Sequence, residues 1–121
     1  MRTITVPLAD VERHGRLRVE TDACPVLVAL VEGTPYAVED ACRHRQASLA
    51  TGVIRDGVVT CPSHLFQYDV RTGARHDREG EPLPAYPARL VGEVIEVDVP
   101  EPVAQPTLRE ILLAAARESR G

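Results

Sequence analysis

Short apolar runs alternate with polar residues along most of the chain, and glycine, proline or aspartate stands between them. Valine-rich runs of this length are typical of β-strands, and no helical period occurs before the last fifteen residues. We therefore predict an all-β fold, with one helical turn over 8–15. The predicted strands are Thr3–Pro7, Leu17–Glu20, Val26–Val31, Tyr36–Glu39, Val58–Thr60, Gln67–Val70, Ala88–Val91 and Val94–Val99.

The pattern changes after residue 99. Residues 100–106 contain three prolines, which cannot donate hydrogen bonds within a sheet and should end it. Thr107 and Glu110 then have the spacing of a capping box, and apolar residues follow at helical spacing. We expect one β domain over 1–99, a proline-rich linker over 100–106 and a short C-terminal helix over 107–121. A helix that folds back onto its own domain is favoured over one that docks a partner.

Length and charge narrow the possible functions. A chain of 121 residues has room for one compact domain. The net charge is −4, every basic residue is arginine, and no basic tract occurs, so we expect no nucleic-acid partner. No apolar run approaches the roughly 20 residues needed to cross a bilayer, and the first residues lack the layout of a secretory signal. We expect a cytoplasmic protein with no membrane contact.

Two short motifs carry the candidate chemistry. They are Cys42-Arg43-His44 and Cys61-Pro62-Ser63-His64, with sixteen residues between His44 and Cys61. Each motif offers one thiolate and one imidazole, and two cysteines on one iron with two histidines on the other is a known ligand set for a two-iron cluster. The intervening residues contain a hairpin-like stretch, 52–59, which would bring the two motifs face to face.

Zinc is the structural alternative, because it also binds two cysteines and two histidines. Zinc modules usually pair like ligands within each arm, whereas here each arm has one cysteine and one histidine. The third cysteine, Cys24, opens an apolar run and is expected to be a small buried hydrophobe. His14 and His76 lie in polar segments and are expected to face solvent.

The stretch from Cys42 to Gly73 resembles the Rieske cluster-binding motif, CxH followed by a spacer and CxxH. Its context, CRHRQASLATGVIRDGVVTCPSHLFQYDVRTG, is similar to ferredoxins that serve aromatic-ring-hydroxylating dioxygenases. The resemblance implies an antiparallel β-sandwich with a small cluster-binding subdomain formed by loops 41–48 and 61–68. It also implies one two-iron two-sulfur cluster on Cys42, His44, Cys61 and His64.

The same resemblance implies a function without catalysis by this chain. A ferredoxin reductase would supply single electrons, and a separate terminal oxygenase would receive them. The small Rieske subunit of a nitrite reductase and a redox-sensing module remain alternatives, because both would share the motif.

Two positions depart from the family pattern. Family members usually have glycine where this chain has Gln46 and Leu65, at tight bends around the cluster. These replacements affect the expected shape of the loops and leave the ligands unchanged.

Further positions bear on the reduction potential. High-potential relatives have additional cysteines at the positions of Ala47 and Ser63, a serine at Phe66 and a tyrosine at Tyr68. Only the tyrosine is kept here, which implies a potential near the low end of the Rieske range, about −150 mV. The Tyr68 hydroxyl is expected either near the cluster sulfurs or facing solvent.

Overall fold

The computed structural model describes residues 1–42, 47–62 and 65–101, and these residues form ten strands and one short helix. The elements in chain order are β1 (Arg2–Pro7), α1 (Leu8–Glu12), β2 (Arg16–Glu20), β3 (Pro25–Val31), β4 (Thr34–Glu39), β5 (Val53–Arg55), β6 (Val58–Thr60), β7 (Gln67–Asp69), β8 (Ala85–Tyr86), β9 (Ala88–Val91) and β10 (Val94–Val99). The predicted helix over 107–121 and the predicted linker from residue 102 onward lie outside the described residues.

The predicted all-β class is confirmed, and each predicted strand is present with ends that differ by two residues at most. β5 forms the first half of the predicted hairpin-like stretch. β8 was not predicted, because its two residues stand between Pro84 and Pro87 and are too few to show a period. The helical turn is shorter than predicted and ends at Glu12.

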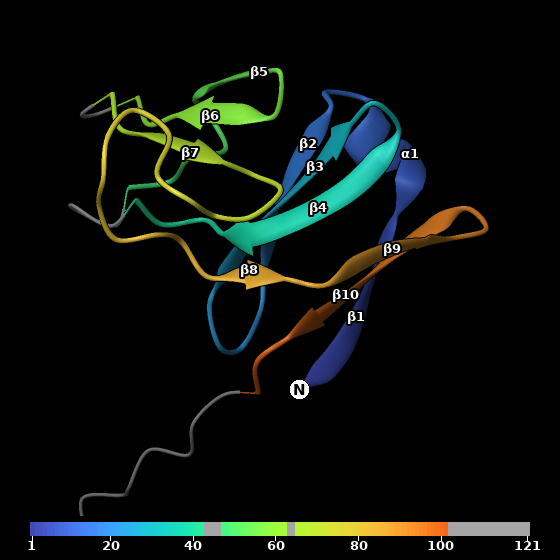
Figure 1. The fold of residues 1–121 in the computed structure, drawn as a ribbon. Helices are drawn as coiled ribbons and strands as arrows, with labels where there is room; N and C mark the ends of the chain where they lie inside the picture. Colours follow the sequence, from blue (N-terminus) through green and yellow to red (C-terminus); the bar gives the residue numbers. More distant parts are fainter. Residues whose placement is uncertain (43–46, 63–64, 102–121) are drawn as a thin grey trace, which may run out of the picture.

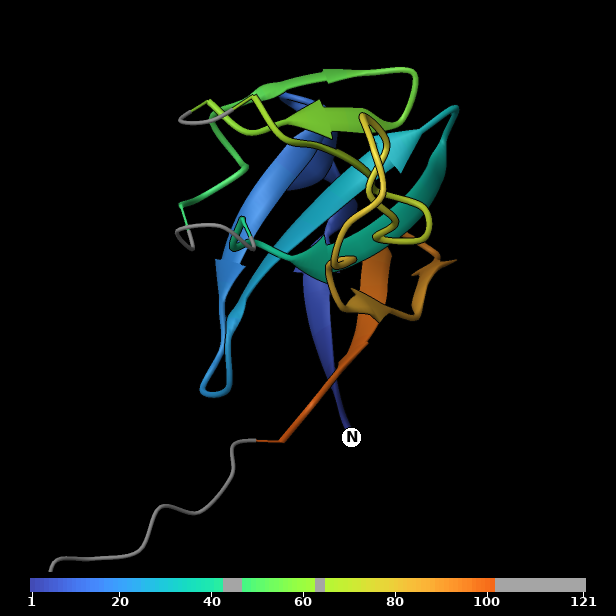
Figure 2. The same cartoon turned by 60° about the vertical axis from the view of Figure 1, so that its left-hand side comes forward.

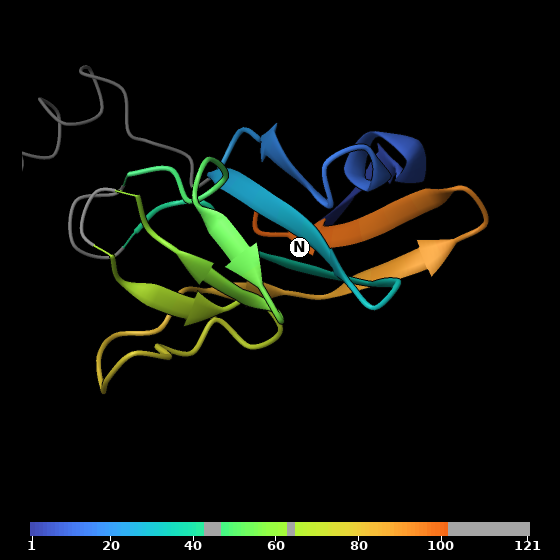
Figure 3. The same cartoon turned by 90° about the horizontal axis from the view of Figure 1, so that it is seen from above.

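The strands form three antiparallel sheets (Figure 1). Their strand orders are β1-β10-β9, β2-β3-β4-β8 and β5-β6-β7. Seen from above, the green β5–β7 sheet and the β1-β10-β9 sheet lie on opposite sides of the blue and cyan strands β2–β4 (Figure 3). The sheet containing β3 is therefore the middle layer of the molecule.

β3 shows why the middle sheet can support two cores. Its sequence PVLVALV is a continuous apolar run, and successive side chains of a strand point to opposite faces. Val26 and Val28 pack into the core shared with β1 and β10, whereas Leu27 and Ala29 pack into the core that contains Cys42 and the β5–β7 sheet. Each fully buried valine or leucine contributes roughly 1.5–3 kcal/mol, so both faces of β3 hold the layers together.

A buried carboxylate just beyond the end of β4 joins the described segments on either side of the first loop. The Asp40 side chain is fully buried, and it accepts hydrogen bonds from the Leu49 backbone N–H at 2.6 Å and the Ser48 hydroxyl at 2.6 Å. Arg18 on β2 donates to the same carboxylate at 2.6 Å. A buried carboxylate is costly without such donors, so Asp40 fixes residues on both sides of the first loop relative to β2.

We expect Asp40→Asn to lower the free energy of unfolding by roughly 1.5–3 kcal/mol, the scale of a hydrogen bond to a charged group. The asparagine amide can accept from Leu49 but turns an N–H group toward Arg18. Urea denaturation followed by circular dichroism measures the change.

Asp22→Asn provides the matched control, because Asp22 pairs with Arg2 on the surface and its side chain is 70% exposed. This control should change stability by no more than about 0.5 kcal/mol. Equal losses in the two variants would show that Asp40 does not hold the loop.

Candidate metal centre

The two motif cysteines lie in one buried cluster although they come from different parts of the chain. Cys42 follows β4, and Cys61 comes directly after β6. Both side chains are fully buried and both thiols are free. They pack with Leu49, Val59 and Tyr68 among the buried residues of the cluster. The structure thus brings together the two predicted thiol ligands.

Each cysteine lies at the start of a loop whose two ends are joined by a backbone hydrogen bond, and we call this joined part the neck of the loop. The Cys42 N–H donates to the Ala47 carbonyl at 2.9 Å, and the Cys61 N–H donates to the Phe66 carbonyl at 2.7 Å. Figure 2 shows that the stems of both loops lie at the same end of the molecule. The predicted ligands His44 and His64 belong to these loops by sequence, and they lie outside the described residues.

The departure at Leu65 does not change the backbone shape that a glycine would provide. Leu65 has φ of 60° in the left-handed region, and its N–H donates to the Cys61 carbonyl at 2.9 Å. This conformation costs a residue other than glycine roughly 1–2 kcal/mol. The side chain is 71% exposed, so the turn is kept while the leucine projects from the surface.

The surface beside Cys61 is mainly apolar. Leu65, Pro62 and the 63% exposed Val53 line a hollow of about 250 Å³ together with Thr51, Gly52, Thr60 and Cys61. Two large apolar side chains, Leu65 and Val53, are therefore exposed beside the loop that follows Cys61.

Tyr68 on β7 connects the core to the first cysteine. The side chain is fully buried, and its hydroxyl oxygen lies 3.7 Å from the Cys42 sulfur. Of the two orientations expected from the sequence, the one toward solvent is therefore wrong. The hydroxyl is placed to donate a hydrogen bond to a thiolate.

A second polar element near the site was not found by sequence reasoning. The Arg75 guanidinium lies 3.6 Å from the centre of the Phe66 ring and forms a two-pronged ion pair with Asp77, at 2.6 and 3.0 Å. Hydrogen bonding by Arg75 lowers the pKa of Asp77 to about 2. The pair joins the 75–77 segment to β7, where the Gln67 N–H also donates to Asp77. The local sequence, RHD, gives no signal beyond its polarity.

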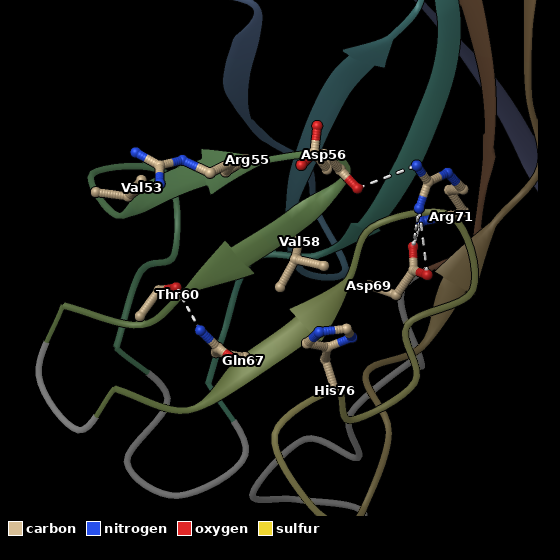
Figure 4. Close-up of a pocket in the computed structure, with 9 residues that line it drawn as sticks. All are labelled: Val53, Arg55, Asp56, Val58, Thr60, Gln67, Asp69, Arg71 and His76. Atoms are coloured by element: carbon tan, nitrogen blue, oxygen red, sulfur yellow. Dashed lines mark hydrogen bonds and ion pairs between the residues drawn. The ribbon is translucent and has the colours of Figure 1, made fainter.

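A larger hollow of about 590 Å³ lies on the outer face of the β5–β7 sheet (Figure 4). It is lined by Val53, Arg55, Asp56, Val58, Thr60, Gln67, Asp69, Arg71 and His76. Arg71 donates to Asp69 and to the Asp56 carbonyl, so its charge is already paired. Neither cysteine lines this hollow, which is therefore separate from the candidate centre.

Three other sequence predictions can be checked. His14 and His76 are exposed, as predicted. Cys24, predicted to be a small buried hydrophobe, packs against the core but is only half-buried, with its sulfur 3.4 Å from the Tyr86 hydroxyl. Burial of Cys24 depends on how the 21–24 turn sits beside β8, and a local apolar pattern does not encode this.

Within residues 1–42, 47–62 and 65–101, no group of three or more histidine, cysteine, aspartate or glutamate side chains could hold a metal ion. The same residues include no helix with the length and apolar character to span a membrane.

The donor set fits a cluster that takes two thiolates on its buried side. Cysteine thiols must be deprotonated to bind metal, and two such charges in an apolar core require a cationic centre to balance them. Cys42 and Cys61 are free, buried and packed in one cluster, so they can supply the two thiolates on that side.

Comparison with known proteins identifies the family. The family model for the Rieske [2Fe-2S] domain matches residues 3–87. The chain is 37% identical over 108 residues to the 3-phenylpropionate/cinnamic acid dioxygenase ferredoxin subunit of Shigella boydii serotype 4 (strain Sb227), covering 87% of this chain and 98% of that relative.

Solved structures agree. The ferredoxin of carbazole 1,9a-dioxygenase from Nocardioides aromaticivorans IC177 is 27% identical with a TM-score of 0.72, covering 80% of this chain and 97% of that one. A chain in the complex of reduced oxygenase and oxidized ferredoxin in carbazole 1,9a-dioxygenase is also 27% identical, with a TM-score of 0.74 and coverage of 84% and 97%.

The cofactor of this family is one Rieske-type [2Fe-2S] cluster, so the family match favours the cluster over zinc, the alternative left open by the sequence. Sequence similarity over most of the chain, the matching fold and the two buried cysteines lead to the same conclusion. The chain belongs to the Rieske [2Fe-2S] family, where it groups with the ferredoxin subunits of dioxygenase systems.

Proposed function

We propose that this chain is a one-electron carrier in the cytoplasm, where it links a ferredoxin reductase to the terminal oxygenase of an aromatic-ring-hydroxylating dioxygenase. The observation that carries the proposal is the pair of buried cysteines at the necks of two adjacent loops. The chain is an electron-transfer component and not itself an enzyme. Similarity to dioxygenase ferredoxin subunits, and to the ferredoxin of an oxygenase complex, supports the two partners.

We assign Cys42 and Cys61 to one iron and His44 and His64 to the other. When bound, the cluster supplies a site that accepts and releases a single electron. The residues around the cysteines exclude water from the thiolate side, and Tyr68 donates toward the Cys42 sulfur. The apolar surface at Leu65 and Val53 lies beside the second loop, where it can contact a protein partner.

We also propose that residues 1–99 form the complete Rieske unit, followed by the linker over 100–106 and the helix over 107–121. Support comes from β10, which ends at Val99 and pairs there with Arg2 at the start of β1. The β1-β10-β9 sheet is therefore formed by residues from both ends of this unit.

The purified protein should contain two irons and two acid-labile sulfides per chain, as the [2Fe-2S] family requires. Elemental analysis and an acid-labile sulfide assay measure these contents.

Exchange of either histidine ligand, His44→Cys or His64→Cys, should lower the reduction potential in any protein that still assembles a cluster, because a thiolate adds negative charge. Voltammetry measures this shift. Stoichiometric zinc without sulfide, or an unchanged potential, would contradict the assignment.

A reconstituted assay tests the role of the chain. Product formation by a reductase and a ring-hydroxylating oxygenase encoded near this chain should depend on its addition, and the Cys61→Ser variant should not replace it. A redox sensor or a nitrite reductase subunit would not sustain this turnover. Equal product with and without the chain would refute the electron-carrier role.

Tyr68→Phe should lower the potential by about a few tens of millivolts at most. The hydroxyl lies beside the Cys42 sulfur, and a donor at that position favours the reduced, more negative state. A neutral hydrogen bond contributes about 0.5–1.5 kcal/mol, and only part of this differs between redox states. Protein-film voltammetry on both proteins measures the shift, and a change under about 10 mV would count against the hydrogen bond.

A further inference from the structure

Arg75 places a fixed positive charge against the wall of the buried cysteine cluster. Its side chain is only 7% exposed, and its guanidinium lies 3.6 Å from the centre of the Phe66 ring and 5.7 Å from that of Tyr68. Tyr68 in turn touches the Cys42 sulfur through its hydroxyl. One aromatic side chain therefore separates the charge from the sulfur.

The Arg75 side chain occupies space that is open because Gly80 has no side chain. A Cβ atom at Gly80 would come within 2.8 Å of an Arg75 terminal nitrogen. Arg75 is therefore enclosed by an aromatic ring on one side and by backbone on another, which holds its charge in one place.

The partner of Arg75 lies farther into solvent than Arg75 itself. The Asp77 side chain is 28% exposed, against 7% for Arg75. Water screens the more exposed charge more strongly. The ion pair is therefore a dipole with its less screened, positive end toward the aromatic wall.

We propose that the Arg75–Asp77 pair is a device that sets the reduction potential of the centre, with Arg75 as a positioning residue whose charge favours the reduced state. The inference rests on the proposed ligation by Cys42, His44, Cys61 and His64. An electron supplied by the reductase adds one negative charge to the centre, and a nearby cation stabilises that charge. Asp77 reduces this effect and keeps Arg75 against the ring.

The electrostatics of the pair agree with this role. The hydrogen bond to Asp77 raises the pKa of Arg75, so Arg75 keeps its positive charge. Asp77, with its pKa lowered to about 2, stays ionised over the whole range in which the protein would work.

Voltammetry on Arg75→Gln, Asp77→Asn and the double variant tests the proposal. Arg75→Gln should make electron uptake less favourable by about threefold, which is roughly 30 mV at 59 mV per tenfold. Asp77→Asn removes the opposing charge and should shift the potential upward by a smaller factor, because Asp77 is the more exposed of the two. The double variant should lie below the parent protein but above Arg75→Gln, because it removes the weaker opposing charge together with the stronger one.

Three control variants separate a charge effect from a structural one. Arg75→Lys keeps the charge and should keep the downward shift below half of that of Arg75→Gln. Arg89→Gln removes a paired cation on β9, in the sheet beyond the middle layer, and should leave the potential unchanged. Arg78→Gln removes an exposed cation 5.6 Å from the Phe66 ring, and its effect should be smaller than that of Arg75→Gln.

Opposite shifts for Arg75→Gln and Asp77→Asn would support the proposal, because a loosened loop would move both potentials in the same direction. Shifts of the same sign, or changes below about 1.5-fold with an intact cluster spectrum, would overturn it. If Arg75→Gln fails to fold, Asp77→Asn still tests the proposal, because a downward shift or no shift in that variant would overturn it. A parent protein without iron or a voltammetric wave would refute the proposed function instead.

Discussion

The metal centre depends on the charge of Asp40, because this carboxylate is buried and cannot be left without donors. Among the residues that the structure describes, it is the one charged side chain that is fully buried. Its donors come from β2 and from residues 48 and 49, so the strand that leads into Cys42 and the segment that returns from the loop meet at one point. The position of the first cysteine follows from this arrangement.

The middle sheet divides the molecule into two cores with different roles. Val26, Val28 and Ile95 belong to a core that joins β3 to the β1-β10-β9 sheet, away from both cysteines. Leu27, Leu49 and Tyr68 belong to the core that encloses them. The first core stabilises the scaffold, so the second can accommodate two thiols and a tyrosine hydroxyl that a purely apolar core would not contain.

The features predictable from the sequence were those encoded locally. Period and valine content indicated the strands, and the two motifs that begin at Cys42 and Cys61 indicated the centre, because each of these signals lies within a few neighbouring residues. β8 was missed for lack of length, and Cys24 is less buried than predicted.

The interactions that shape the site could not be predicted in the same way. Asp40 and Arg75 look like ordinary polar residues, and their roles depend on partners that only the fold brings close. Arg18 lies 22 positions from Asp40, and the Phe66 ring meets Arg75 only because residue 75 bridges back to Tyr68. Positions 44 and 64 were assigned from sequence alone, and the described structure adds the loop necks from which they extend.

The burial of both cysteines has a consequence for the rate of electron transfer. Water molecules near a redox centre must reorient when its charge changes, and this motion makes up much of the reorganisation energy. The apolar side chains around Cys42 and Cys61, including Leu49, Val59 and Leu83, leave little room for such water on the thiolate side. That side therefore contributes little to the barrier for electron transfer.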